Sequence, residues 1–323
     1  PKQPRRPPPP PPPPGSEPPH QQQASLPPAS PETADSRPPA EHGQVPNPES
    51  NTAPSQQTVK TSSEGTTQKM NAIVNSNQPS PTDLPVIVHF ILQGKGGVGK
   101  SFAAALLAQY QKDAGRAQGL VDTDPVNSTF YGYTALGAER IELMEEGTLN
   151  ERRFDQVIER ILEEDQSFVI DNGAASFIPL SSYLLENDVI QLLLDSGRRV
   201  MIHTVVTGGQ AMMDTLNGFN TLASQLPEGA ELIVWLNEFF GPIEADGKQF
   251  EEMKVYKQYK DKVKGLIRIH RQTSATFGTD VQLMLENKLT FDEVATSGQF
   301  GLMAQQRLKT VRKQIWSQLE LIL

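Results

Sequence analysis

The chain of 323 residues contains no cysteine. Disulfides, thiolate-bound metals, iron–sulfur clusters and a cysteine nucleophile are therefore excluded. Long apolar runs are missing too, because no stretch reaches the roughly 18 apolar residues that a membrane-spanning helix needs. The N-terminal region also lacks the apolar segment of a signal peptide. From these absences we expect no membrane span and no secretion signal.

Aromatic residues are absent from the first quarter of the chain, where Phe90 is the first Phe, Tyr or Trp. The same region holds 22 of the 27 prolines, including an unbroken run at residues 7–14. So few apolar groups cannot offset the lost conformational entropy, and residues 1–84 are predicted to be disordered. The proline run predicts a short polyproline II rod, which favours a spacer and leaves docking to an aromatic groove open. Residues 85–323 suffice for one sizeable domain.

Positive charge is in deficit. The net charge of the chain is −9, and residues 85–323 alone carry 23 Lys and Arg against 31 Asp and Glu. This balance argues against a protein that coats nucleic acid through bulk charge, although it leaves a local basic patch open.

Apolar runs alternate with helical patterns from residue 85 onward. The predicted strands are 86–92, 117–121, 168–170, 200–206, 232–236 and 266–269, and the predicted helices are 102–112, 150–164, 179–194, 211–226 and 300–323. This alternation predicts an α/β fold with a doubly wound, mostly parallel sheet and helices on both faces. Ligands in such sheets bind beyond the carboxyl ends of the strands.

A glycine-rich loop lies between the first predicted strand and the first predicted helix. It matches the pattern G-x-x-x-x-G-K-[ST] in its required context. Its backbone N–H groups would face a phosphate, Lys100 would add positive charge at the β- and γ-phosphates, and Ser101 would ligate Mg²⁺. The general pattern does not require Lys95, which from the residues alone could equally be an exposed surface lysine. The predicted nucleotide-contacting residues are Gly94, Lys95, Gly96, Gly97, Val98, Gly99, Lys100, Ser101 and Phe102.

Carboxylates follow two predicted strands. Asp122 and Asp124 come directly after 117–121, and Asp171 ends 168–170. Two carboxylates at this spacing can approach a γ-phosphate, one toward metal-bound water and one toward the attacking water. The alternative for the first pair is a helix cap or Asx turn before a proline. Asp171 has the position of the acidic residue that holds Mg²⁺ directly or through water.

Asn237 ends the predicted strand 232–236, where its carboxamide could bond the edge of an adenine. A strand-end turn is the alternative. The guanine-reading pattern N-K-x-D is absent, because Glu238 follows Asn237, and ATP is therefore favoured over GTP. His203 and His270 occur in strand-like runs and are predicted to be structural rather than metal ligands.

Taken together, these residues resemble a known class. The loop at 95–101 resembles the deviant Walker A loop of ParA/MinD-class P-loop ATPases, residues 122–125 resemble the second motif of that class, and Asn237 resembles its base-contacting asparagine. More narrowly, residues 88–109 and 122–133 resemble the TraL family of conjugal transfer proteins. The sequence Asp-Asn-Gly-Ala at 171–174 also suits that family better than ParA proteins, whose strand end usually continues into prolines. The resemblance covers about residues 86–320.

The resemblance implies a P-loop NTPase of the SIMIBI type that binds ATP and Mg²⁺, hydrolyses ATP slowly and forms a homodimer in the ATP state. Lys95 would cross to the partner's phosphates, Asp124 would orient the attacking water, and Asp122 would support the metal, with Ser101 and Asp171 as further ligands. Asn172 and Gly173 depart from the ParA pattern, which leaves the hydrolysis rate open.

A bacterial cytoplasm and an unidentified conjugation or partition partner are also implied by the resemblance. The open alternatives are a ParA-like partition ATPase that binds DNA nonspecifically and a nucleotide-sensing adaptor with negligible turnover. MinD proteins attach to membranes through a C-terminal helix, so the amphipathic end of this chain is relevant. Packing of that helix on the sheet is the favoured prediction. Its apolar face would carry Leu308, Val311, Ile315, Leu319 and Ile322.

Overall fold

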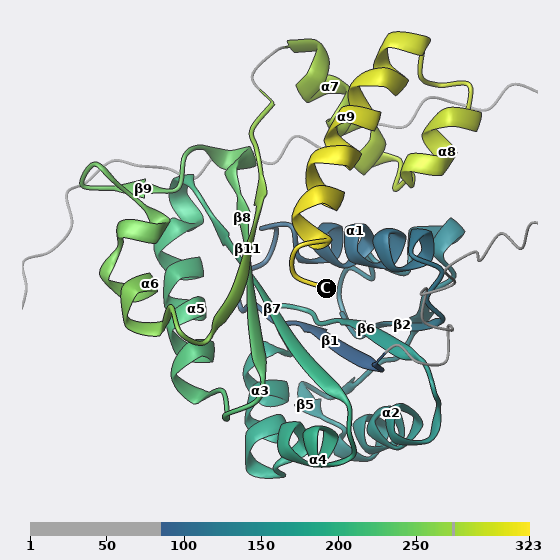
Figure 1. The fold of residues 1–323 in the computed structure, drawn as a ribbon. Helices are drawn as coiled ribbons and strands as arrows, with labels where there is room; N and C mark the ends of the chain where they lie inside the picture. Colours follow the sequence, from purple (N-terminus) through teal and green to yellow (C-terminus); the bar gives the residue numbers. More distant parts are fainter. Residues whose placement is uncertain (1–84, 273–274) are drawn as a thin grey trace, which may run out of the picture. The chain divides into compact units, whose positions relative to one another are not determined.

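The computed structural model describes residues 85–272 and 275–323, so the proline-rich segment predicted at 1–84 lies outside the described residues. The described chain is built on a seven-stranded parallel sheet of order β11-β8-β7-β1-β6-β2-β3 (Figure 1). Its strands are β1 (Ile87–Ile91), β2 (Gln118–Asp122), β3 (Glu139–Arg140), β6 (Ser167–Asp171), β7 (Arg199–Thr207), β8 (Glu231–Asn237) and β11 (Val263–Ile269).

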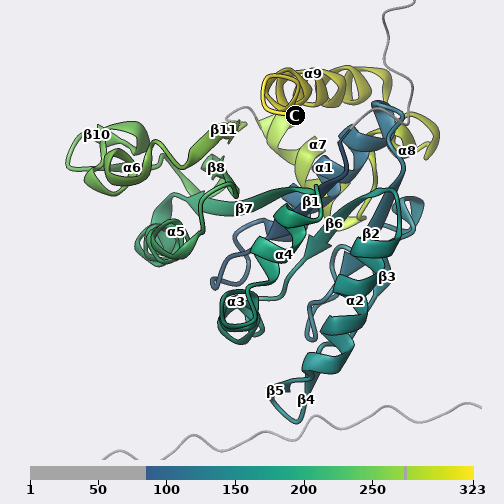
Figure 2. The same cartoon turned by 60° about the horizontal axis from the view of Figure 1, so that its bottom comes forward.

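Helices cover both faces of this sheet (Figures 1 and 2). One face carries α1 (Lys100–Asp113), α7 (Ala275–Glu286), α8 (Phe291–Thr296) and α9 (Leu302–Leu319). The other carries α2 (Glu151–Glu163), α3 (Phe177–Glu186), α4 (Val189–Asp195) and α5 (Met212–Gln225). The helix α6 (Lys254–Tyr259) lies beside α5, and two short hairpins, β4 (Met144–Glu145) with β5 (Thr148–Leu149) and β9 (Glu244–Ala245) with β10 (Lys248–Gln249), complete the elements. The predicted fold class is confirmed.

The central strands are apolar throughout because both of their faces are covered. In β1 every residue is buried. Val88 and Phe90 join the core under α2 to α5, whereas Ile91 joins the core under α1 and α9. Successive side chains of a strand point to opposite faces, so a continuous apolar run supplies both cores at once.

The helix predicted at 179–194 is in fact two helices. Its residues belong to α3 and α4, which are separated at Asn187 and Asp188. Asp188 has a φ of 49°, in the left-handed region that ends a right-handed helix. An Asp tolerates this conformation better than most residues, which is the physical reason for the break.

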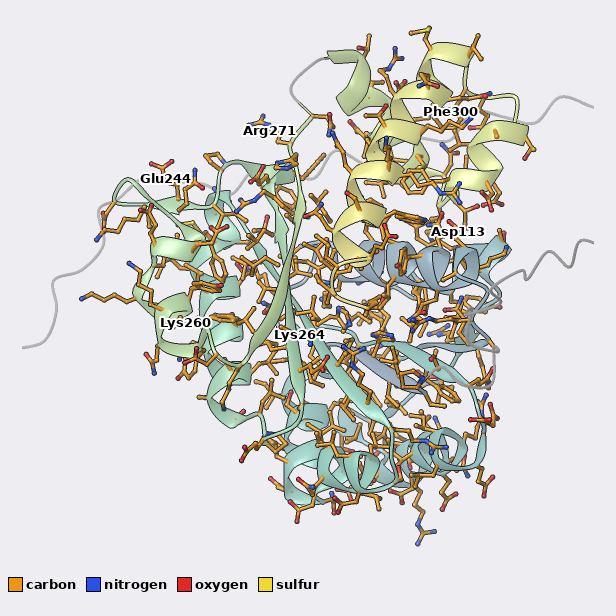
Figure 3. The ribbon with its side chains drawn as sticks, viewed as in Figure 1. Asp113, Glu244, Lys260, Lys264, Arg271 and Phe300 are labelled. Carbon is orange, nitrogen blue, oxygen red and sulfur yellow. The ribbon has the colours of Figure 1, made fainter. Side chains whose placement is uncertain are left out.

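The C-terminal helix packs on the sheet, as predicted. Leu308, Val311, Ile315 and Leu319 are buried in the core that contains α1. Asp113 lies at the end of α1 (Figure 3). It accepts hydrogen bonds from the Arg312 guanidinium and, at 2.7 Å, from the Trp316 indole. The apolar face of α9 is therefore already covered within the molecule. In the part of the chain that the structure describes, no helix is long and apolar enough to cross a membrane.

A chain of buried polar side chains crosses the middle of the sheet. Trp235 Nε1 donates to His203 Nδ1 (3.0 Å), so His203 carries its proton on Nε2 and donates it to His89 Nδ1 (3.0 Å). His89 Nε2 then carries a proton that needs an acceptor, and Gln111 supplies one when its amide oxygen faces the ring. Burial lowers the pKa of His203 to about 3 and the pKa of His89 as well, so both rings are neutral. The predicted structural role of His203 is confirmed.

Candidate functional site

The glycine-rich loop connects β1 to α1 at the carboxyl edge of the sheet. Gly97 and Gly99 have φ values of 72° and 101°, a region that favours glycine over any residue with a Cβ. A Cβ on Gly99 would also lie 2.8 Å from Asn237 Nδ2. Both positions therefore favour glycine for conformational reasons, and Gly99 for a steric reason as well. The curled loop places the start of α1 at the site.

Lys100 lies within the curl of the loop. Its side chain is buried, and its Nζ donates to the Lys95 carbonyl oxygen at 3.0 Å. Burial lowers the pKa of Lys100, whereas the carboxylates of Asp171 and Asp124 raise it. The ammonium group therefore lies inside the loop, bonded to the Lys95 carbonyl and near the carboxylates of Asp171 and Asp124. A phosphate bound by the loop would contact this ammonium group.

Lys95 extends from the opposite side of the loop. Its Nζ lies 2.8 Å from Asp214 Oδ2, and both side chains are about half exposed to solvent. Asp214 is in the first turn of α5. The additional lysine of the loop is therefore paired with a carboxylate of its own chain. No motif in the sequence marks Asp214 as its partner.

Asp122 and Asp124 shape the loop that follows β2. Asp122 is fully buried, and its two oxygens accept the backbone N–H groups of Asp124 (2.9 Å) and Tyr131 (2.8 Å). Burial raises the pKa of Asp122, and these N–H donors oppose that shift. Asp124 Oδ1 accepts from the backbone of Val126 (2.8 Å) and Asn127 (3.2 Å), so the Asx turn that was the alternative interpretation is present.

Asp171 is the least satisfied carboxylate of the site. It is 1 % exposed, and neither of its oxygens has a hydrogen-bond partner of good geometry among the residues described, although the Ser101 hydroxyl is close enough to lower its pKa. Burial, with smaller contributions from Asp122 and Asp124, raises the pKa of Asp171 to about 7, while Ser101 and Lys100 oppose the shift. A buried carboxylate without donors is destabilising on its own, and a divalent cation bound to oxygen ligands would satisfy it. The residues present therefore fit a Mg²⁺ ion between Ser101 and Asp171.

Two adjoining cavities flank the loop. They share Gly97, Gly99, Phe102 and Leu285 as walls. The first, about 490 Å³, is mostly apolar and is lined by Asn237, Phe239, Phe240, Ile269 and Val281 among others. The second, about 560 Å³, has a more polar lining than the first and is lined by Lys100, Ser101, Asp124, Thr129, Tyr133 and Ala174 among others. A flat aromatic group suits the first cavity, and an anionic group suits the second.

Asn237 lies at the border of the apolar cavity but is committed to the loop. Its Nδ2 donates to the Val98 carbonyl at 2.9 Å, and its Oδ1 accepts from the Phe239 backbone at 3.2 Å. The predicted contact with an adenine base therefore stays a prediction, whereas the predicted strand-end turn is present. Asn237 also ties β8 to the glycine-rich loop.

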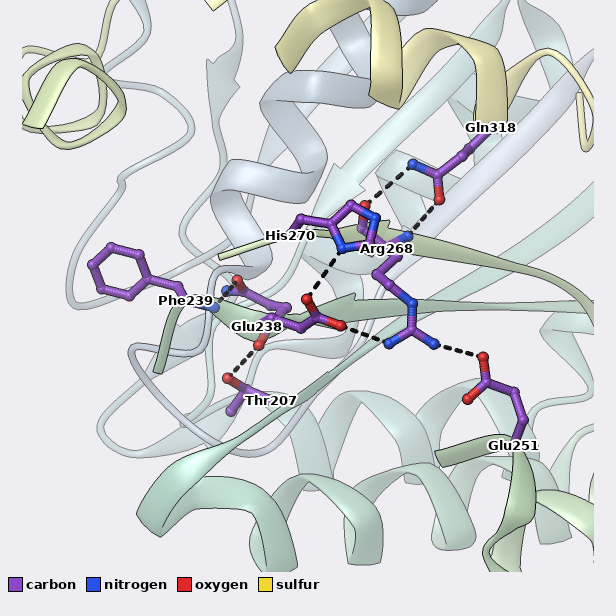
Figure 4. Close-up of polar contacts among 8 residues, drawn as sticks. Thr207, Glu238, Phe239, Glu251, Arg268, His270 and Gln318 are labelled. Carbon is purple, nitrogen blue, oxygen red and sulfur yellow. Dashed lines mark hydrogen bonds and ion pairs between the residues drawn. The ribbon is translucent and has the colours of Figure 1, made fainter. Parts of the chain in front are cut away.

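A network of charged and polar side chains connects the end of β11 with the residues after β8 and with α9 (Figure 4). Arg268 on β11 bridges Glu238 at 2.6 Å and Glu251 at 2.5 Å, and His270 Nδ1 lies 3.2 Å from the second oxygen of Glu238. The amide of Gln318 on α9 bonds the backbone N–H and carbonyl of Arg268. His270 thus lies just beyond β11, on the wall of the apolar cavity, rather than inside the strand.

Comparison with known proteins agrees with this geometry. Residues 89–280 match the model of the CobQ/CobB/MinD/ParA nucleotide binding domain. The chain belongs to this family. Two Escherichia coli proteins, each named Protein TraL, are 48 % and 47 % identical to it over 233 residues, which make up 72 % of this chain and 97 % of theirs. The sequence resemblance to ParA/MinD-class and TraL proteins is confirmed.

Solved structures of the same kind are similar at lower identity. The MinD cell division protein of Aquifex aeolicus has a TM-score of 0.40 and 14 % identity, covering 72 % of this chain and 98 % of its own. A putative plasmid partition protein of Borrelia burgdorferi bound to AMPPNP has a TM-score of 0.37 and 17 % identity, covering 72 % and 99 %.

Most predicted site residues meet at one edge of the sheet, since the glycine-rich loop, Asp124 and Ser101 line the same cavity. Asp171 lies close enough to Lys100 and Ser101 for each to lower its pKa. Tyr133, Leu285 and the aromatic pair at 239–240 were not predicted as site residues. Phe239 and Phe240 come just after Asn237 and Glu238, and that position was the available signal for them. Tyr133 ends the segment 122–133 that resembles the TraL family, whereas Leu285 lies in a segment without a recognisable motif.

Proposed function

We propose that the chain is a Mg²⁺-dependent ATPase that acts as a dimeric switch in conjugal plasmid transfer or maintenance in the bacterial cytoplasm. The observation that carries this proposal is the pair of adjoining cavities, one apolar and one lined by Lys100 and Ser101. Their shared wall is the glycine-rich loop, so a base and its phosphates can be held together. The role in plasmid transfer rests on the similarity to the two TraL proteins.

Each part of the nucleotide has a matching part of the site. The base would enter the apolar cavity beside Phe239, and the phosphates would contact the loop N–H groups and Lys100. Ser101 and Asp171 would hold Mg²⁺, which supplies charge neutralisation at the β- and γ-phosphates. Glu238 stands where a guanine-reading lysine would be, which supports ATP over GTP.

Hydrolysis needs a group that orients water. Asp124 lines the phosphate cavity, and its Oδ1 is used in the turn with Val126 and Asn127. Its Oδ2 makes no hydrogen bond to the described part of the chain, so this oxygen is free to accept one from an attacking water. Asp122 would act indirectly, since its bonds to the backbone of Asp124 and Tyr131 position the same loop.

A second copy of the chain would cover the rim of the site. Large apolar side chains that are about half exposed or more occur in segments that adjoin site residues in the sequence: Val126, Ile178, Met213, Phe239 and Phe240. Exposed apolar side chains near a site support an interaction surface there. Lys95 projects from the same rim and would exchange Asp214 for the partner's phosphates when ATP brings two copies together.

Two variants of the loop test this proposal. Lys100→Ala removes the buried ammonium and is expected to abolish ATP binding. Lys95→Ala is expected to bind ATP nearly as the wild type does but to lose ATP-dependent dimerisation and hydrolysis. Nucleotide affinity, mass by light scattering and phosphate release are measured for both. Normal dimerisation and turnover of Lys95→Ala would overturn the dimeric mechanism while leaving nucleotide binding in place.

A nucleotide-sensing adaptor with negligible turnover is the second candidate. The use of Asp124 Oδ1 in a turn favours it, because half of the carboxylate is already committed. Phosphate release with and without DNA and candidate transfer proteins separates the two: stimulated release supports the ATPase, and none under any condition supports the adaptor. An ATP-dependent, salt-sensitive shift of random DNA would instead indicate a partition function.

A further inference from the structure

The Tyr133 side chain is a buried polar group without a role so far. It lies between β2 and β3, is 2 % exposed, and lines the phosphate cavity with Lys100 and Asp124. Its hydroxyl makes no hydrogen bond to any residue in the described ranges 85–272 and 275–323, and it is not sealed from the cavity. A molecule that fills the cavity can therefore accept a hydrogen bond from this hydroxyl.

The order of the strands indicates which part of the nucleotide that is. The apolar cavity lies by the ends of β8 and β11, the glycine-rich loop follows β1, and Tyr133 lies beyond β6 on the connection from β2. A nucleotide with its base at β8 and β11 and its phosphates over β1 extends its last phosphate toward β2. Tyr133 therefore lies at the end of the site farthest from the base.

The chemistry of the hydroxyl suits this position. Burial and the nearby charge of Asp171 raise the pKa of Tyr133, so the phenol keeps its proton and can donate it in a hydrogen bond. The terminal phosphate oxygens are strong acceptors, and a hydrogen bond to a charged group is stronger than one between neutral groups. Tyr133 belongs to the same loop as Asp124, whose turn is held by Asp122.

We propose that the Tyr133 hydroxyl donates a hydrogen bond to the terminal phosphate of ATP, so that the loop at 122–133 distinguishes ATP from ADP. This inference rests on the proposed nucleotide site. It gives Tyr133 a positioning role: its contact with the third phosphate draws the Asp124 loop toward the reacting centre, and loss of that phosphate releases the loop.

Tyr133→Phe tests the inference because it removes only the hydroxyl. Affinities for a non-hydrolysable ATP analogue and for ADP, each with Mg²⁺, are measured by titration calorimetry. The analogue is expected to bind about tenfold to a hundredfold more weakly, with ADP affinity within about twofold of wild type. Tyr110→Phe is the matched control, since that phenol packs edge-on against Trp316 at the other end of α1, and it should bind both nucleotides normally.

Two results would overturn the inference while leaving the nucleotide site intact. Equal losses for the analogue and ADP would show that the hydroxyl serves the site as a whole, and unchanged affinities would show that it contacts neither nucleotide. Melting temperatures of the two variants identify any general loss of folding. If the wild-type protein bound neither nucleotide, the nucleotide site itself would be wrong and the role of Tyr133 would fall with it.

Discussion

The phosphate end and the base end of the site are built in different ways. The phosphate end combines buried charges, namely Lys100, Asp122 and Asp171, with a loop whose backbone is fixed by glycines at positive φ. The base end is a mostly apolar space between Phe239, the end of β11 and α7. Buried charges that lack a partner are costly, whereas apolar walls tolerate change. Substitutions at the phosphate end should therefore have large, pH- and cation-dependent effects, and those at the base end small ones.

Among the substitutions that compare the two ends, Asp171→Asn should have the largest effect. In the absence of nucleotide this variant should be more stable than the wild type. In the folded chain the pKa of Asp171 is raised from 3.8 to about 7, so the folded state binds more protons than the unfolded state. The free energy of unfolding therefore decreases as the pH rises from 3.8 to about 7, and the total loss above pH 7 is up to about 4 kcal/mol. The variant should melt at a higher temperature than wild type at pH 8, with a difference that shrinks toward pH 5.

Melting curves across pH, without ATP or Mg²⁺, measure this effect. Asp261→Asn is the control, since that carboxylate is exposed. A pH-independent difference between Asp171→Asn and wild type would contradict the electrostatic account of the phosphate end. With ATP and Mg²⁺ present the wild type should regain the stability that the ionised carboxylate costs it, because the cation satisfies Asp171.

Phe239→Ala examines the base end, where a smaller and more uniform effect is expected. Removing one aromatic wall should weaken ATP and ADP by a similar factor, about tenfold, since stacking against a base contributes about 1–3 kcal/mol. Titration with both nucleotides at two pH values gives the measurement. Leu192→Ala is the control, an exposed apolar residue on α4 away from the cavity. Unequal losses of affinity for ATP and ADP would contradict the proposed difference between the base end and the phosphate end.

Asp214→Asn should have the smallest effect on stability, because an ion pair between half-exposed side chains contributes at most about 1 kcal/mol. Its expected effect is on assembly: releasing Lys95 should raise the fraction of ATP-bound dimer several-fold while ADP affinity stays unchanged. Sedimentation at several protein concentrations measures this fraction. A lower dimer fraction would mean that Asp214 supports Lys95 in the dimer instead of competing for it.

The same contrast explains how much could be predicted from sequence. Gly99, Lys100 and Ser101 form a local motif whose conformation depends on adjacent residues, so the loop and its two flanking elements were predictable. The position of Asp171 at the carboxyl edge of the sheet was predictable because this carboxylate ends an apolar run. The base end combines Asn237 with residues on α7, far apart in sequence, and only packing brings them together.

Some of the remaining misses had local signals. The helix α8 begins with a capping box in which Thr290 and Glu293 bond each other's backbone, a pattern visible in the sequence. The left-handed conformation of Asp188, by contrast, falls inside a continuous helical pattern in which no Gly or Pro marks the break. The hydrogen bonds of Asn237 to the loop could not be read from its position, because a strand-end carboxamide serves a ligand or the backbone equally well.

The buried hydrogen bonds that connect Trp235, His203 and His89 restrict how β1, β7 and β8 can align with one another. The surrounding side chains of β1, β7 and β8 are mostly aliphatic, and aliphatic side chains can exchange positions with little penalty. In the parallel register His203 lies opposite Ile91, two residues along from His89. A slip of one residue would turn His203 to the other face and leave the Trp235 and His203 N–H groups without acceptors. These buried hydrogen bonds therefore favour a single alignment of the strands during folding.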